Sequence, residues 1–144
     1  MLEKLRKINL KTAVIMGICF YLLTILLHVL IICSVIPYTW VNGGRSDSFA
    51  AQLPLSIFSI LICMIGVVFT QVVGGNPQYK HKRLRTVLCW VFVAFWSFGF
   101  LQQLLGTPFE KMFCSLLLIL GIVSNLRMAI EEDGSHTCTE EILP

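Results

Sequence analysis

The chain has 144 residues, of which 56% are hydrophobic and 13% are charged, and its formal net charge is +3. A soluble domain usually contains about 25% charged residues, so this chain has too little polar surface to cover a globule in water. The composition and the mean hydropathy of +0.81 exclude an ordinary soluble domain.

Four apolar stretches are long enough to cross a bilayer, since a helix that rises about 1.5 Å per residue needs about 20 residues to cross roughly 30 Å of hydrocarbon. They are 13–35, 55–73, 86–105 and 109–130. The apolar run of the first is too long for a cleaved signal peptide, and no cleavage pattern of small residues follows it. We therefore predict an all-α fold, a transmembrane four-helix bundle that forms a single integral membrane domain, 1–144.

The distribution of lysine and arginine predicts how these helices are oriented. Nine of the 11 lie in the N-terminal segment, the basic connection 74–85 and the C-terminal end, which leaves only Arg45 and Lys111 elsewhere. Lysine and arginine concentrate on the cytoplasmic side of membrane proteins. We therefore expect an up-down-up-down bundle with both termini cytoplasmic, an outward loop at 36–54 and a cytoplasmic tail at 133–144. The basic connection is typical of a membrane anchor, so we expect no nucleic-acid partner.

Two segments carry the signals of helix starts. The sequence TPFE predicts that Thr107 caps the last helix and that Glu110 completes a capping box. The connection before it is about three residues long, so the helices it joins are expected to be antiparallel neighbours. In the loop, the segment 46–52 indicates a short interfacial helix with Ser46 or Asp47 as its cap.

The loop 36–54 is the longest polar interruption of the chain. Its Gly-Gly pair at 43–44 permits backbone angles that other residues avoid, and Arg45 follows directly. One interpretation is that this turn presents backbone N–H groups and a guanidinium to an anion, such as a lipid phosphate or a carboxylate. The other is a tight turn in which Arg45 pairs with Asp47 or Glu110.

Polar residues concentrate in the outward third of the predicted helices. His28 lies roughly 22 Å from the inner face at about 1.5 Å per residue, and Gln102 and Gln103 lie at a similar depth. Two interpretations stay open. The polar groups bond one another between helices, at about 0.6 and up to 2 kcal/mol per contact, or they line a pocket for a small amphiphile or lipid beneath the loop. The candidate ligand-binding residues are His28, Tyr38, Trp40, Arg45, Ser56, Ser59, Gln102, Gln103 and Glu110.

The sequence contains no motif that assigns a reaction. It has no G-x-S-x-G, P-loop or H-E-x-x-H pattern, and no ionisable side chain in the middle of a predicted helix, which argues against a proton-coupled pump. The six cysteines form no C-x-x-C pair and fit the role of small hydrophobes. His28 has no nearby metal-ligating partner. We therefore expect no catalytic residue, no metal and no cofactor.

The stretch IPYTWVNGGR after the first helix, together with the FEK turn that opens the fourth, resembles a group of small, uncharacterised bacterial four-helix membrane proteins. Members of that group have a similar length and a comparable (I/V)PY…GGR loop. The resemblance covers most of the chain and implies a bacterial inner-membrane location, but no activity. Its shared positions are Pro37, Tyr38, Gly43, Gly44, Arg45, Phe109, Glu110 and Lys111.

These observations favour a non-enzymatic integral membrane protein. It would bind a lipid-like or small anionic amphiphile at its outward end, or contact a partner there. One alternative is a small transporter or flippase subunit, which needs a polar path through the core. Another is a membrane enzyme that acts on lipid or quinone through His28, Glu110 and Arg45. Membrane lipids are the expected partners, and a protein partner or a second copy of the chain is a further possibility.

Overall fold

The computed structural model describes residues 5, 7–74 and 82–130. All regular structure in these ranges is helical, and four of the helices are long and apolar enough to cross a membrane. The predicted all-α fold is therefore confirmed. The predicted tail at 133–144 lies outside the described residues.

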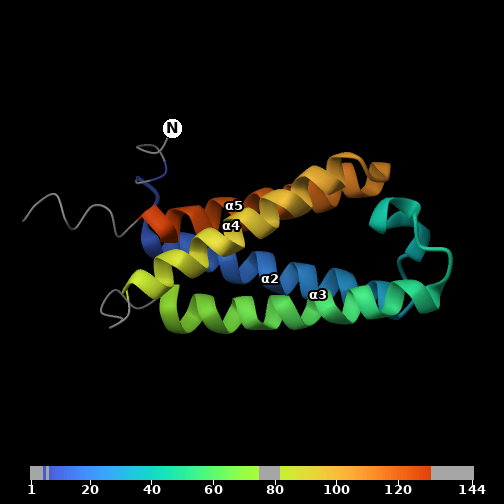
Figure 1. The fold of residues 1–144 in the computed structure, drawn as a ribbon, viewed down its shortest axis with the longest axis horizontal. Coiled ribbons are helices and arrows are strands. Elements are labelled where there is room, and N and C mark those ends of the chain that lie inside the picture. The colour runs from blue at the N-terminus through green and yellow to red at the C-terminus, as the bar shows by residue number, and fades with distance from the viewer. Residues whose placement is uncertain (1–4, 6, 75–81, 131–144) are drawn as a thin grey trace, which may run out of the picture.

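The four long helices lie side by side along the longest axis of the molecule (Figure 1). They are α2 (Leu10–Ile32), α3 (Phe49–Phe69), α4 (Lys82–Leu104) and α5 (Ser115–Ile130). A π-helical turn, Thr70–Gly74, continues α3, and a second one, Glu110–Cys114, precedes α5. The connection between α2 and α3 and the turn between α4 and α5 lie at the same end, here called the loop end.

The connection between α2 and α3, called the 33–48 loop, is shorter than the sequence predicted. The helix α3 begins at Phe49 rather than at residue 55, and Pro54 lies inside it. Ser48 has an extended backbone, and its hydroxyl accepts a hydrogen bond from the N–H of Ala51 at 3.2 Å. This is the geometry of an N-cap. The predicted cap at Ser46 or Asp47 was therefore wrong, and the segment 46–52 forms no separate helix.

Small residues allow the helices to approach closely away from the loop end. The helix α2 packs against both α3 and α5, and α5 packs against α4. The ring of Phe20 on α2 lies directly over Gly121 on α5, and the ring of Tyr21 lies over Gly66 on α3. Small residues at helix contacts are typical of membrane bundles, where close backbone approach supplies much of the packing energy.

Two hydrogen bonds join α2 to α5 in the same region. The hydroxyl of Ser124 donates to the carbonyl of Ala13 at 2.7 Å, and the side-chain amide of Asn125 donates to the Tyr21 hydroxyl at 3.3 Å. Interhelical hydrogen bonds therefore occur in the bundle away from the loop end, where they join α2 to α5.

The outer surface of the bundle is strongly apolar. Large hydrophobic side chains on all four helices are more than half exposed, including Leu22, Ile65, Val91 and Leu116. Lipid tails can solvate such side chains, whereas water cannot do so favourably. The fold is therefore consistent with a multi-pass membrane protein, and the up-down-up-down orientation across the membrane stays a prediction.

The substitution Gly121→Ala is expected to lower the thermal unfolding temperature of the protein in detergent. An added Cβ would lie 2.6 Å from Cε1 of Phe20, and overpacking of this kind costs about 1–3 kcal/mol. Gly99→Ala is the matched control, because its Cβ would meet Leu118 at an ordinary 3.8 Å. Both substitutions gain the same helix propensity. Equal unfolding temperatures for the two variants would contradict the close approach of α2 and α5.

Candidate ligand-binding cavity

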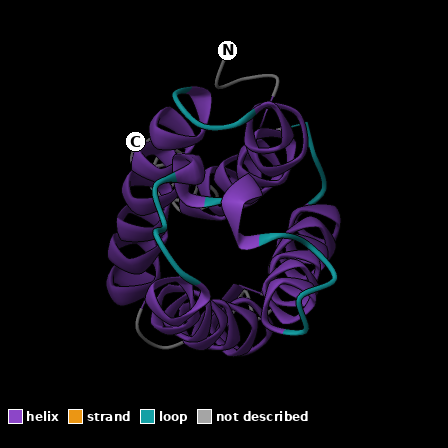
Figure 2. Cartoon of the chain, turned by 90° about the vertical axis from the view of Figure 1, so that its right-hand side faces the viewer, coloured by secondary structure: helices purple, strands orange, loops and turns teal. Residues whose placement is uncertain are grey.

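A cavity with a volume of about 400 Å³ lies at the loop end of the bundle. Side chains from all four long helices and from the 33–48 loop line it. Viewed from this end, the helices surround the axis of the bundle and the loop crosses over it (Figure 2). Val41 and Asn42 of the loop line this end of the cavity.

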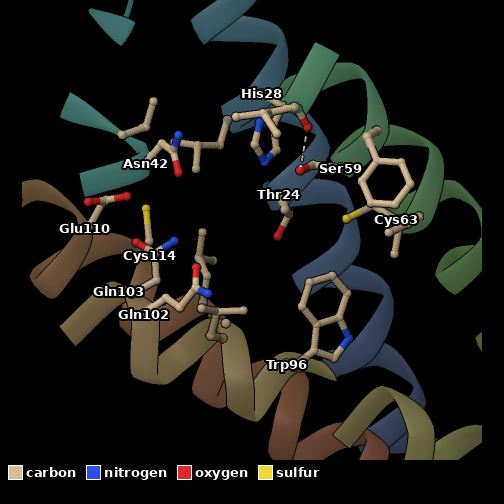
Figure 3. Close-up of a pocket in the computed structure, with 18 of the residues that line it drawn as sticks. Thr24, His28, Asn42, Ser59, Cys63, Trp96, Gln102, Gln103, Glu110 and Cys114 are labelled. Carbon is tan, nitrogen blue, oxygen red and sulfur yellow. Dashed lines mark hydrogen bonds between the residues drawn. The ribbon is translucent and has the colours of Figure 1, made fainter. Parts of the chain in front are cut away.

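Five of the nine candidate residues line this cavity. They are His28, Ser59, Gln102, Gln103 and Glu110. Figure 3 shows that they approach it from α2, from α3, from α4 and from the π-helical turn before α5. The structure thus brings together polar groups that the sequence placed only at a similar depth.

The other four candidate residues do not line the cavity. Ser56 is fully buried in α3 and accepts a hydrogen bond from the amide of Gln52, which does line the cavity, at 3.4 Å. Trp40 and Arg45 are exposed and Tyr38 is half-buried. The aromatic residues and the arginine of the loop are therefore placed outside the enclosed space.

Glu110 is 2% exposed and holds the loop in place. Its Oε2 accepts hydrogen bonds from the N–H of Gly43 at 2.9 Å and from the N–H of Thr107 at 2.8 Å. The Thr107 hydroxyl in turn accepts from the N–H of Glu110 at 3.4 Å, which confirms the predicted capping box. One carboxylate therefore caps its own helix and binds the loop at the same time.

The turn at 42–44 has the backbone geometry that this contact needs. Asn42, Gly43 and Gly44 have φ angles of 56°, 68° and 68°, a region that glycine enters at no steric cost. The turn presents a backbone N–H to an anion, as one interpretation of the Gly-Gly pair proposed, but the anion is the chain's own Glu110. Among the described residues, no ion pair joins Arg45 to Asp47 or to Glu110.

Further contacts hold the loop on two sides. The Thr107 hydroxyl donates to the carbonyl of Trp40. The Ser46 hydroxyl donates to Oε1 of Gln52 on α3 at 2.6 Å, and the side-chain amide of Asn42 donates to Ser46 at 3.3 Å. The loop is thus fixed both to α3 and to the turn between α4 and α5.

Three residues that line the cavity, His28, Trp96 and Gln103, each have a buried side-chain atom without a hydrogen-bond partner. Nδ1 of His28 and Oε1 of Gln103 are buried and unpaired. The Ser59 hydroxyl donates within its own helix, to the carbonyl of Leu55 at 2.9 Å. The interpretation that these groups bond one another between helices was therefore wrong. A buried unpaired polar atom costs about 1–3 kcal/mol, a cost that a bound molecule in the cavity can remove.

An aromatic cluster closes the cavity on the side away from the loop. Phe20 and Trp96 meet edge to face with ring centroids 5.0 Å apart, and Tyr21 packs against Phe20 at 4.9 Å. Cys63 and Leu118 complete this buried cluster. Trp96 on α4 therefore packs against α2.

Several lining residues were not predicted from the sequence, although helix spacing indicates some of them. Thr24 lies four residues before His28, and Gln52 lies four residues before Ser56, so each pair shares a helix face. Thr24 and Gln52 both line the cavity. Cys114 lies four residues after Glu110 and also lines it, but the π-helical turn that carries both was not predicted.

No metal site accompanies the cavity in the part of the chain that the structure describes, since no group of three or more metal-ligating side chains occurs there. No family model, no curated protein and no solved structure matches the chain. The function is therefore argued from the cavity itself.

The substitution Glu110→Gln is expected to speed hydrogen exchange of the backbone amide of Gly43. It replaces a charged acceptor, and hydrogen bonds to charged groups contribute about 1.5–3 kcal/mol, so we expect exchange to become about tenfold faster. Exchange of loop peptides followed by mass spectrometry would measure this effect.

The matched control is Arg45→Gln, which removes a charge from the same loop. The Arg45 side chain is exposed, and no hydrogen bond or ion pair to another described residue holds it, so exchange at Gly43 is expected to stay at its wild-type rate. An equal effect of both variants would contradict the role assigned to the carboxylate of Glu110.

Proposed function

We propose that the protein is a non-enzymatic, multi-pass membrane protein that binds a lipid-like amphiphile in the cavity beneath the 33–48 loop. The observation that carries this proposal is a cavity of about 400 Å³ with a mostly apolar lining, into which His28 and Gln103 bring buried polar atoms that have no hydrogen-bond partner. Ligand sites typically have volumes of about 300–1,000 Å³ and combine an apolar wall with a few polar groups.

The charges of the lining favour an uncharged head group. Glu110 contributes a carboxylate to the cavity, and neither lysine nor arginine lines it. An anion placed beside that carboxylate would cost several kcal/mol, because like charges repel strongly where water is excluded. Arg45, the group expected to attract an anion, is exposed outside the cavity. The geometry therefore supports a neutral amphiphile better than an anionic one.

The inner boundary of the cavity favours binding over transport. A transporter or flippase needs a polar path through the core, and the cluster around Phe20, Tyr21 and Trp96 fills the bundle directly below the cavity. The hydroxyl of Tyr21, which belongs to this cluster, already accepts a hydrogen bond from Asn125 within the protein. Binding without passage fits this arrangement best.

The contacts of the lining also favour a non-enzymatic role. Covalent catalysis needs a nucleophile within hydrogen-bond reach of a base. Within the described residues, no hydrogen bond joins His28 to a hydroxyl or thiol group of the cavity, and its Nδ1 has no partner. We therefore propose binding rather than chemistry on lipid or quinone.

The proposed location is the inner membrane of a bacterium, with the loop end outward. The excess of lysine and arginine toward the other end supports this orientation, and the resemblance of the IPYTWVNGGR loop supports the bacterial assignment. Membrane lipids would then supply the ligand. The exposed Trp40 and Arg45 are available to a protein partner or to a second copy of the chain.

The substitution Gln103→Leu is expected to weaken binding of an uncharged monoacylglycerol without lowering the unfolding temperature. Oε1 of Gln103 is buried without a partner, so its removal relieves a desolvation cost in the empty protein. In the complex it removes a hydrogen bond worth about 0.5–1.5 kcal/mol, which is an affinity loss of up to about tenfold. Native mass spectrometry and thermal unfolding would measure the two effects.

Gln71→Leu is the matched control, because Gln71 is exposed in the π-helical turn after α3 and does not line the cavity. A fatty acid of the same chain length tests the preference for a neutral head, and it is expected to bind more weakly. Unchanged affinity of the Gln103 variant for monoacylglycerol would count against the proposed site.

A further inference from the structure

Neighbouring helices of the bundle are not all packed equally closely. The helix α2 packs along α3 and α5, and α5 packs along α4, but α3 and α4 do not pack closely along their length. Away from the loop end, the rings of Phe69 on α3 and Phe92 on α4 meet with centroids 5.5 Å apart. Toward the loop end, α3 and α4 diverge (Figure 1). The separation is thus confined to the part of the bundle that holds the cavity.

The side chains around this separation both line the cavity and reach the outer surface. Phe58 on α3 and Phe98 on α4 are 59% and 63% exposed, and Leu55 and Phe95 beside them are 46% and 45% exposed. The side chains that α2 and α5 contribute to the lining are buried or half-buried. The cavity therefore has a lateral opening, defined by Leu55, Phe58, Phe95 and Phe98.

The lateral opening differs in chemistry from the loop end. Its four side chains are apolar, and the surface of α3 and α4 around it is apolar as well, with Leu61 and Leu101 more than half exposed. At the loop end, Glu110 accepts a hydrogen bond from Gly43 of the loop, and Ser46 of the loop donates one to Gln52 on α3. The side of the cavity is thus compatible with hydrocarbon, whereas the loop end is held together by polar contacts.

We infer that the cavity is filled from the bilayer, through the lateral opening, by a single-chain lipid with an uncharged, hydroxyl-bearing head. The inference rests on the proposed function and adds the route and the ligand class. The hydroxyl head would donate to Oε1 of Gln103 beside His28, and the chain would leave between Phe58 and Phe98. A volume of about 400 Å³ is near the lower limit for ligand sites, which suits one chain better than a whole two-chain phospholipid.

The fluorescence of Trp96 can report the entry of a lipid into the cavity. Trp96 is 8% exposed and lines the cavity, whereas Trp40 and Trp90 are about half exposed. In a Trp40→Phe, Trp90→Phe background in lipid vesicles, fluorescence would come from Trp96 alone. A brominated monoacylglycerol is expected to quench this fluorescence more than a brominated two-chain phospholipid at the same mole fraction, and more than a brominated fatty acid.

The route is tested by the rates of quenching and recovery when the probe is added to or withdrawn from the vesicles. Phe98→Ala widens the lateral opening and is expected to raise both the association and the dissociation rate about threefold or more. A residue that only contacted the bound lipid would change the dissociation rate alone. Phe113→Ala is the matched control, because Phe113 is 60% exposed and does not line the cavity.

Ser46→Ala tests the competing route, because it removes the hydrogen bond from the loop to Gln52 on α3. Rates that rise in the Ser46 variant and not in the Phe98 variant would place entry under the loop and overturn the lateral route, while binding itself stands. Quenching by monoacylglycerol no stronger than by phospholipid would overturn the single-chain ligand, and quenching of Trp96 by none of the three probes would overturn the proposed function and the route together. These failures are therefore distinguishable.

Discussion

The position of the loop depends on the carboxylate of Glu110. This group is almost fully buried, and a buried carboxylate is tolerated only where hydrogen bonds replace its hydration. The N–H groups of Thr107 and Gly43 supply those bonds, one from its own helix start and one from the loop. The carboxylate also requires glycine at position 106, because a Cβ there would collide with Oε2. The loop is therefore held at this end of the cavity because the buried carboxylate of Glu110 needs hydrogen-bond donors.

Local rules predicted part of this arrangement and could not predict the rest. The capping box at Thr107 follows from a four-residue pattern, and one of two interpretations of the Gly-Gly pair was that it offers N–H groups to an external anion. That the anion is instead Glu110, 67 positions away from Gly43 in the sequence, depends on how α4 and α5 place their connecting turn against the loop. No local pattern specifies such a contact. The same limit explains why Arg45 was assigned a partner that the structure does not give it.

The depth of a residue along the bundle was easier to predict than the direction in which its side chain points. The rise of a helix fixes how far His28 and Gln103 lie along the bundle, and both line the cavity. Direction requires the packing of the helices, since a shift of one residue turns a side chain by roughly 100°. Ser56 illustrates this point, because it lies at the depth of the cavity and yet faces Gln52 inside the protein. The start of α3 was predicted at residue 55 from the apolar stretch alone, although the hydroxyl of Ser48 caps the helix six residues before Pro54.

The placement of small residues explains both the close packing of the helices away from the loop end and the cavity at the loop end. Gly17, Gly66 and Gly121 let α2 approach α3 and α5 away from the loop end, where a side chain on any of them would collide with a neighbour. At the loop end the facing positions carry larger groups such as Leu27, Phe58 and Phe98, so the helices cannot converge there. Hydrogen bonds in the loop then join the diverging helices without filling the space between them. A rigid, closed half and an open half with unpaired polar atoms are what a binding protein needs, because the first fixes the shape of the second and a ligand removes its desolvation cost.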